Sequence, residues 1–288
     1  MEGSAVAVRP ILTADVAAAS RFLHEHLDSK VPVTAWSALL TPPWPDTAPN
    51  HGFQLLSGED VVGVYAAVYS ERAIRGERVS ICNLAAFCVL EGYRSHGLRL
   101  VRALLSQKEY EFTDLSPSGN VVALNERFGF RRLDTATKLV ANLPRFPRRG
   151  TRVTNDPAAL ERALRGLDAA IYRDHREASA TQHLLVEHAG GHGYLVFRKD
   201  RRKGIAAFAS PLHAGGDPGC LEQAWPSVGS HLLLHHGLAA TLAERRVLGF
   251  APGPGFDLAE PRAKMYRGDR LDADTVDYLY SELTLVRW

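Results

Sequence analysis

The alternation of apolar and polar residues in the first half of the chain predicts a mixed α/β fold. Residues 79–90 form a nearly continuous apolar run, which is typical of a buried central strand. Residues 97–107 place Leu98, Val101 and Leu105 on one helical face, so they predict an amphipathic helix that begins at a glycine. The full expected order is β-α-α-β-β-β-α-β-α-β, with strands at 6–12, 53–56, 61–69, 79–90, 109–115 and 130–141 and helices at 13–27, 34–40, 97–107 and 117–128.

A stretch rich in proline and charge, residues 143–150, indicates a boundary between two domains, 1–145 and 150–288. The second half loosely repeats the element order of the first. A degenerate second copy and an unrelated α+β cap both fit this pattern, because no fixed-period similarity supports the repeat. The expected elements are a helix at 157–173 capped by Asp156, strands at 183–187, 194–198 and 205–210, a helix at 228–245, and a last strand within 278–288.

Composition limits the class of protein. The chain has 288 residues, of which 45% are hydrophobic and 23% charged, as in an ordinary globular protein. Its formal net charge of +2 is too small for a general nucleic-acid or membrane-surface binder, so any phosphate binding should be local. Without a signal segment or a long apolar run, we expect a cytoplasmic protein.

The three cysteines favour reduced thiols. Their number is odd and none forms a C-x-x-C pair. Cys82 and Cys88 fall on one predicted strand about 20 Å apart, which is beyond the reach of a disulfide. We therefore expect structural thiols.

One junction carries a recognisable chemistry. The apolar strand at 79–90 runs into a short polar segment with a glycine, and a helix follows at once. A helix N-terminus offers unpaired N–H donors and a favourable dipole to a phosphate, and a glycine lets the backbone approach closely. Arg94 and Arg99 add local positive charge. The junction therefore predicts a phosphate-binding site.

The segment Arg94-Ser95-His96-Gly97-Leu98-Arg99 resembles the Arg/Gln-x-x-Gly-x-Gly/Ala signature of the GNAT N-acetyltransferases. Residues 125–130, Asn-Glu-Arg-Phe-Gly-Phe, resemble the helix-to-strand ending of the same fold, and the resemblance covers residues 6–141. It implies tandem GNAT-like domains, each with a central mixed, mostly antiparallel sheet flanked by helices. The second domain has residues 213–217 where that signature would stand and should not bind coenzyme A in the same way. Arg99 departs from the family, which has a small residue there.

The resemblance implies a cosubstrate, acetyl-CoA or another acyl-CoA, and no metal. Backbone groups of the central strand would hydrogen-bond the pantetheine arm, and the amides of the following segment would hold the pyrophosphate. The implied cofactor-binding residues are Phe87, Cys88, Val89, Arg94, Ser95, His96, Gly97, Leu98 and Arg99. Although Cys88 falls near the thioester, we expect it to be a packing thiol.

The catalytic pattern of the family is incomplete. Asn83 stands where the family commonly has a glutamate or histidine that acts as the general base. Asn125 stands where the family usually has a tyrosine that acts as the general acid. Neither amide exchanges protons at neutral pH. Asp114 is the nearest ionisable candidate for a base, and a helix-capping role ahead of Pro117 is its alternative. Catalysis by proximity and the absence of catalysis both remain open.

These observations predict an acyl-CoA-dependent N-acyltransferase, with acetyl as the expected group and an amine of a small molecule or peptide as acceptor. The alternative is a non-catalytic acyl-CoA-binding or scaffolding protein. The second half is expected to shape the acceptor pocket together with residues 42–50, and a homodimer is a further expectation.

His231 and His235 lack the glutamate of a zinc motif, because Leu232 takes its place. The acidic and aromatic segment 277–283 fits core packing or contact with an amine.

Overall fold

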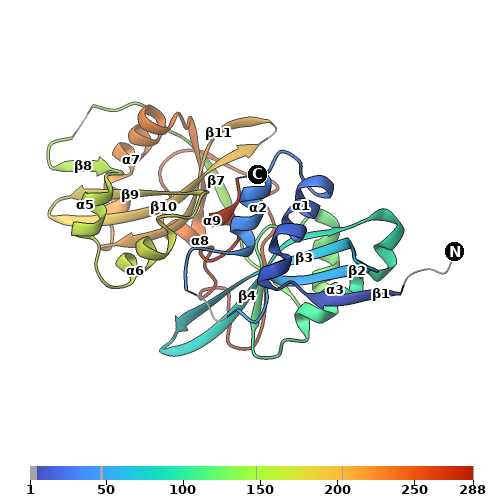
Figure 1. The fold of residues 1–288 in the computed structure, drawn as a ribbon. Helices are drawn as coiled ribbons and strands as arrows, with labels where there is room; N and C mark the ends of the chain where they lie inside the picture. The colour runs from blue at the N-terminus through green and yellow to red at the C-terminus, as the bar shows by residue number, and fades with distance from the viewer. Residues whose placement is uncertain (1–4, 46–47, 147, 203, 288) are drawn as a thin grey trace. The chain divides into compact units, whose positions relative to one another are not determined.

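The chain folds into two compact units (Figure 1). The computed structural model describes residues 5–45, 48–146, 148–202 and 204–287. Unit 1 contains the chain up to Leu133 together with Ala263–Val276 and Tyr280–Val286, and unit 2 contains Asp134–Arg262, Asp277–Leu279 and Arg287. Within the described residues each unit has one seven-stranded mixed sheet, so the predicted α/β class is confirmed.

The sheet of unit 1 has the strand order β1-β2-β3-β4-β5-β14-β6. Neighbouring strands are antiparallel except β4 and β5, which run parallel. The long β3–β4 hairpin forms the middle of the sheet and carries its most buried residues. The strands are β1 (Val6–Pro10), β2 (Gly52–Ser57), β3 (Asp60–Ile74), β4 (Glu77–Val89), β5 (Glu111–Asp114), β6 (Arg131–Arg132) and β14 (Met265–Arg267).

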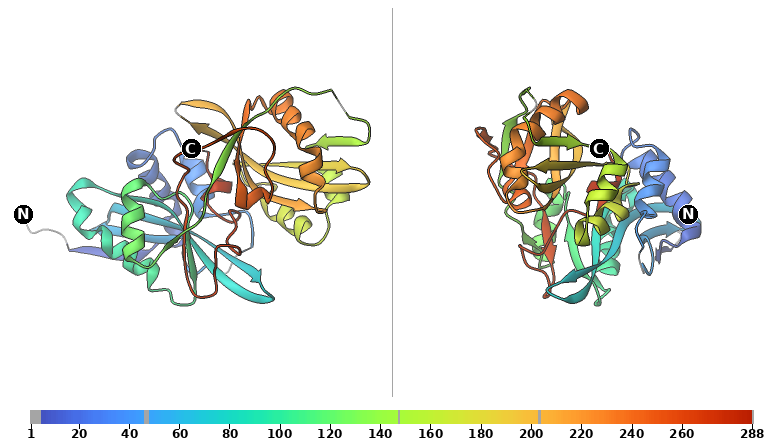
Figure 2. Two further views of the ribbon diagram at one scale, coloured as in Figure 1. Left: turned by 180° about the vertical axis from the view of Figure 1, so that it is seen from behind. Right: turned by 90° about the vertical axis from the view of Figure 1, so that its left-hand side faces the viewer.

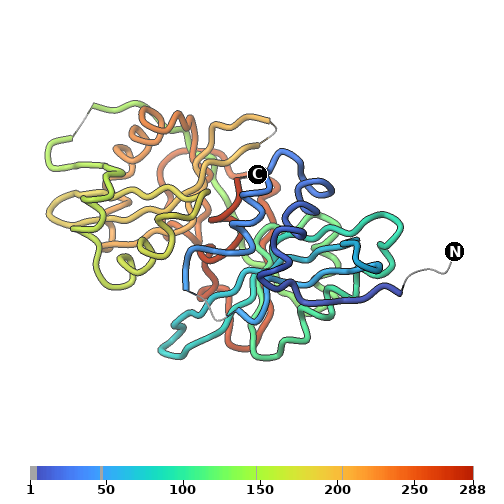
Figure 3. Tube along the Cα trace, viewed as in Figure 1, coloured from blue at the N-terminus to red at the C-terminus, as the bar shows by residue number. Residues whose placement is uncertain are grey.

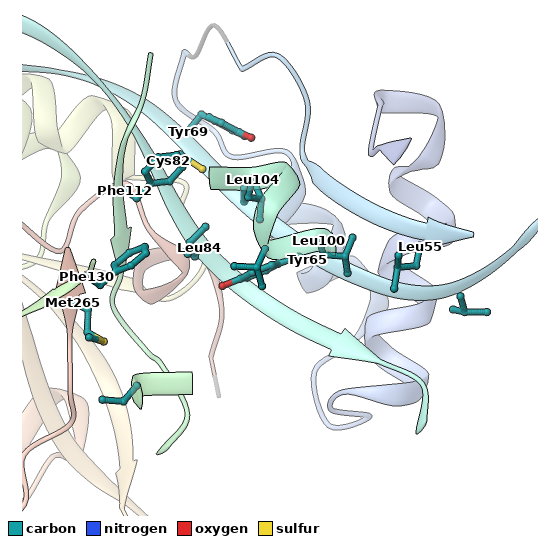
Figure 4. Close-up of a cluster of buried hydrophobic side chains, with 14 residues drawn as sticks. Leu55, Tyr65, Tyr69, Cys82, Leu84, Leu100, Leu104, Phe112, Phe130 and Met265 are labelled. Carbon is teal, nitrogen blue, oxygen red and sulfur yellow. The ribbon is translucent and has the colours of Figure 1, made fainter. Parts of the chain in front are cut away.

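Helices cover both faces of this sheet. Figure 2 shows α1 (Val16–His26) and α2 (Val33–Leu40) on one face, and α3 (Gly97–Leu105) and α4 (Gly119–Arg127) on the other. Under α3 lies an apolar core drawn in Figure 4, made mainly of Leu55, Tyr65, Tyr69, Cys82, Leu84, Leu100, Leu104, Phe112, Phe130 and Met265. The predicted apolar face of α3 is wrong at Leu98, which is 44% exposed. The buried positions follow the helical spacing of Leu100 and Leu104 instead.

The sheet of unit 2 has the order β8-β9-β10-β11-β12-β7-β13, again with a single parallel pair, β11 and β12. This order repeats that of unit 1 position by position, so the predicted second copy is confirmed as a fold. The strands are β7 (Thr137–Ala141), β8 (Thr151–Thr154), β9 (Thr181–His188), β10 (Gly191–Arg202), β11 (Ile205–Gly216), β12 (Ala240–Glu244) and β13 (Phe256–Asp257). The helices are α5 (Pro157–Ala163), α6 (Gly166–His175), α7 (Cys220–His236) and α8 (Arg245–Leu248).

The two halves of the chain exchange a strand. β7, from the first half, lies between β12 and β13 in unit 2, and β14, from the second half, lies between β5 and β6 in unit 1. The C-terminal return can be followed along the Cα trace (Figure 3), and Met265 pairs there with Asp114. The predicted single strand at 130–141 is therefore wrong. It breaks at a turn in which Asp134 Oδ1 accepts the N–H of Ala136 at 2.9 Å.

The same exchange changes the domain boundary. The sequence predicts one cut between residues 145 and 150, whereas unit 2 begins at Asp134 and two later segments return to unit 1. The predicted last strand is also wrong over its described part. Ser281 caps a short helix, α9 (Glu282–Leu285), by accepting the N–H of Leu283 at 3.2 Å.

Two predicted helices of the second half also differ. The helix expected at 228–245 begins earlier and ends at Gly237, which has φ +69° and closes α7, so the next residues are free to form β12. The helix expected at 157–173 is broken into α5 and α6, because Leu164 is extended and Gly166 has φ +54°. The predicted cap is present, since Asp156 Oδ1 accepts the N–H of Ala158 at 3.2 Å. Among the described residues, no helix combines the length and apolarity needed to cross a membrane.

Candidate functional site

The parallel strands β4 and β5 in the sheet of unit 1 are paired over only part of the length of β4. Their ladder pairs Ile81, Cys82 and Asn83 of β4 with three residues of β5 and ends there. β4 continues to Val89 and stays paired with β3 on its other side. The segment 84–89 therefore has backbone groups on the β5 side that lie beyond the ladder. Such groups are available to a ligand that carries amides.

A bulge bends β4 at the point of separation. Ala66 of β3 pairs with Ala86, and the next residue, Ala67, pairs with Leu84. Ala85 is therefore the extra residue on β4. Because a bulge kinks its strand and increases the local twist, it directs 86–89 away from the line of β5.

The polar segment after β4 is itself helical. Glu91–His96 forms a 3-10 helix that continues directly into α3 at Gly97. Gly97 is buried, and a Cβ at this position would lie 3.2 Å from Cζ of Phe87 and 3.7 Å from Cγ2 of Val89. A glycine thus allows the start of α3 to pack directly on the unladdered part of β4.

The two arginines of this segment have different surroundings. Arg94 is largely exposed, and its Nη1 lies 3.8 Å from Oε1 of Glu91, a surface ion pair of small energy. Arg99 instead donates from Nη1 to the carbonyl of Val6 on β1 at 2.8 Å. Arg99 therefore anchors α3 to the edge strand, and Arg94 is the more available cation.

The three predicted catalytic candidates lie in one buried polar cluster. Asn83, Asp114 and Asn125 are all at most 5% exposed. Asn125 Nδ2 donates to Asp114 Oδ2 at 2.7 Å, and Thr113 Oγ1 donates to Asn83 Oδ1 at 2.9 Å. β4, the end of β5 and the last turn of α4 therefore bring these three side chains together.

A fourth member, Glu282, comes from α9 and was missed by the sequence analysis. Its side chain is fully buried; Oε2 accepts from Asn83 Nδ2 at 2.5 Å and Oε1 accepts from Ser116 Oγ at 2.5 Å. The acidic and aromatic character of 277–283 is the one sequence signal that pointed toward it. That segment was expected as a strand, and nothing local places it in unit 1.

Burial governs the titration of this cluster. The pKa of Asp114 is raised to about 7, first by burial and second by the charge of Glu282, while hydrogen bonds from Asn125 and the Ser116 backbone act in the opposite direction. Burial also raises the pKa of the Tyr65 phenol well above its usual range, so this side chain stays protonated. Burial raises the pKa of the Cys88 thiol as well, which opposes thiolate chemistry there.

The raised pKa of Asp114 predicts a pH dependence of stability. Between about pH 4 and pH 7 the folded protein keeps a proton on this carboxyl that the unfolded chain releases, so its contribution to the free energy of unfolding falls as pH rises. Moving the pKa from 3.8 to about 7 corresponds to up to about 4 kcal/mol. Asp114→Asn removes this titration and still accepts from Asn125. Denaturant unfolding should show the variant gaining stability relative to wild type from pH 4 to pH 7; parallel curves would contradict the raised pKa.

The histidines of α7 form a ring contact without a metal-ligand set. The rings of His231 and His235 stack with centroids 4.3 Å apart. Over the parts of the chain that are described, no group of three or more His, Cys, Asp or Glu side chains is placed to hold a metal ion.

The fold has counterparts among solved structures. A GCN5-related N-acetyltransferase from Anabaena variabilis aligns with 91% of this chain over 72% of its own, with a TM-score of 0.57 and 12% identity. A GCN5-related N-acetyltransferase from Kribbella flavida aligns with 91% of this chain over 71% of its own, with a TM-score of 0.56 and 14% identity. No protein-family profile and no curated protein sequence matches the chain. The chain therefore has the fold of the GCN5-related N-acetyltransferases in tandem form.

Proposed function

We propose that unit 1 binds an acyl-CoA, with acetyl-CoA as the first candidate, and transfers the acyl group to an amine of a small molecule or peptide. The observation that carries the proposal is the separation of β4 from β5 directly before the Gly97 helix start. This arrangement offers the unladdered backbone groups of β4 and, after them, the positive end of the helical run that leads into α3, in which the N–H of Gly97 donates to the carbonyl of Arg94. The likeness in fold to N-acetyltransferases supports the same chemistry.

The pantetheine arm would lie along the unladdered part of β4. Its two amide groups match the backbone groups of Phe87, Cys88 and Val89 in kind, as an added strand would. The pyrophosphate would then lie over the residues that open α3, Ser95 to Arg99, with Arg94 supplying charge. Arg99 contributes through its backbone, since its guanidinium is held by β1.

We expect unit 2 to lack a second coenzyme A site. At the corresponding junction, between β11 and α7, Asp217 Oδ2 accepts the N–H of His192 at 2.8 Å. The N–H of Gly216 is also taken, by Asp168 Oδ2 at 2.8 Å. Two carboxylates at this place repel a phosphate and occupy donors that it would use. We also propose, from the sequence alone, that unit 2 takes part in acceptor selection with residues 42–50 and in dimerisation. Residues 46–47 of that segment lie outside the described residues.

The proposal is tested by coupling a binding measurement to a turnover measurement. Calorimetry with acetyl-CoA should give a stoichiometry of one per chain. Incubation with acetyl-CoA and a panel of amino sugars, polyamines, aminoglycosides and peptides should release free thiol with at least one acceptor. Binding without thiol release from any acceptor would favour the non-catalytic acyl-CoA-binding alternative. The observation behind that alternative is that Asn83 and Asn125 stand where the resemblance implies proton-handling side chains. No binding would exclude both.

A further inference from the structure

A surface hydroxyl in unit 1 is bonded to a fully buried carboxylate. Ser116 is exposed, and its Oγ donates to Oε1 of Glu282 at 2.5 Å. Glu282 has no exposed surface, and its second oxygen accepts from Asn83. A hydroxyl can accept one proton while it passes on another, and a carboxylate is a proton acceptor. Through the Ser116 hydroxyl, a proton from a group at the surface can therefore reach the buried carboxylate of Glu282.

The position of Ser116 suits such a role. It lies two residues after the end of β5, just past the Asn83–Thr113 pair at which the β4–β5 ladder stops. The carboxyl ends of parallel strands meet at one edge of a sheet, so Ser116 lies where the two strands begin to separate. In the proposed complex the pantetheine follows 84–89, and the thioester comes to that same edge.

The two asparagines lie next to carboxylates. Asn83 donates to Glu282, and Asn125 donates to Asp114. Each position at which the resemblance implies a proton-handling side chain thus holds an amide that orients a buried carboxyl. The groups able to exchange protons are present one hydrogen bond away from the expected places.

We propose that Ser116 and Glu282 form the proton relay of the transferase, with Asn83 as a positioning residue for Glu282. This inference rests on the proposed function. The neutral amine nitrogen attacks the thioester carbonyl carbon, a C–N bond forms, and the C–S bond breaks. The nitrogen gives a proton to Ser116 Oγ as the hydroxyl proton moves to Glu282 Oε1. The reverse transfer delivers one proton to the leaving sulfur, so the reaction yields amide and free thiol and restores the relay.

The relay depends on a distant part of the chain. Ser116 and Glu282 are 166 positions apart, and the carboxylate enters unit 1 only through the returning segment Tyr280–Val286. Glu282 and Ser116 are therefore brought together by tertiary folding rather than by any local motif.

The test separates proton transfer from structure. In Glu282→Gln, the new amide can still accept from Asn83 and can donate to Ser116 Oγ, so folding and the Kd for acetyl-CoA should stay near wild type. Because an amide takes no proton, kcat should fall at least about a hundredfold with little change in KM. The kcat of Ser116→Ala should fall by a similar factor. Ser116→Thr keeps the hydroxyl and should retain most of the wild-type kcat.

Ser118→Ala is the matched control. Ser118 is exposed, lies two residues away, and makes no side-chain hydrogen bond as the N-cap of α4. It should leave kcat and KM unchanged. Wild-type kcat in Ser116→Ala or in a folded Glu282→Gln would overturn the relay and leave the proposed function intact. A wild-type protein that binds acetyl-CoA but releases no thiol with any amine would overturn the proposed function and the relay with it.

Discussion

Gly97→Asp is expected to weaken the binding of acetyl-CoA at least about a hundredfold, equivalent to about 3 kcal/mol. The substitution acts in two ways. Its Cβ would lie 3.2 Å from Cζ of Phe87, so the ring must shift, and its carboxylate would face the proposed pyrophosphate at the start of α3. Isothermal titration calorimetry of the folded variant measures the effect.

Gly97→Asn separates these two causes. Asparagine has nearly the same shape as aspartate and carries no charge, so it should retain the steric cost and lose the repulsion. We expect it to bind acetyl-CoA about tenfold better than Gly97→Asp at low ionic strength, with a gap that narrows as salt is added. Equal affinity of wild type and Gly97→Asp would show that the pyrophosphate binds elsewhere.

The elements around this glycine were predictable because their signals are local. A long apolar run predicts β4, and helical spacing after a glycine predicts α3, both without knowledge of the rest of the chain. The register of the apolar face was less predictable, as Leu98 shows. Only the packing of α3 on the sheet decides which neighbouring leucines are covered.

The strand exchange could not be predicted in this way. β14 is three residues long, too short for any periodicity, and its pairing with β5 and β6 depends on a chain reversal far from either strand. The break between β6 and β7 depends on the same event. The exchanged strands β7 and β14 each hold apolar residues that suit a sheet, and these residues do not specify which of the two sheets they join.

Three of the four members named in the polar cluster were predictable, and the fourth was not, for a related reason. Asn83 and Asn125 were found through the resemblance, and Asp114 as the nearest acid. Their partner Glu282 lies 199 positions after Asn83. Beyond the acidic and aromatic character of 277–283, a physical clue was available: an asparagine in a buried strand needs a partner for its amide, and an acid within an apolar segment needs donors. This reasoning predicts that each buried polar side chain has a hydrogen-bond partner, but it does not predict that Asn83 and Glu282 are partners of each other.

Removing the chain after Arg262 is expected to unfold unit 1 and abolish the binding of acetyl-CoA, although every residue of β4 and the Gly97 segment is retained. The truncation removes β14 from between β5 and β6 and takes Glu282 from Asn83. It also removes the buried side chains of Met265, Leu271, Leu283 and Leu285. At roughly 1.5–3 kcal/mol each, these four contribute about 6–12 kcal/mol, comparable to the whole stability of a domain.

A stop after Val286 is the matched control, because it keeps both segments that return to unit 1 and removes only the end of the chain. This shorter truncation should bind acetyl-CoA as the full chain does and unfold at a similar temperature. The comparison also explains why deleting residues 150–288 cannot isolate a role of the second half in acceptor binding: that deletion takes β14 out of the unit 1 sheet. Binding of acetyl-CoA by a folded 1–262 fragment would show that β14 and Glu282 are dispensable for the site.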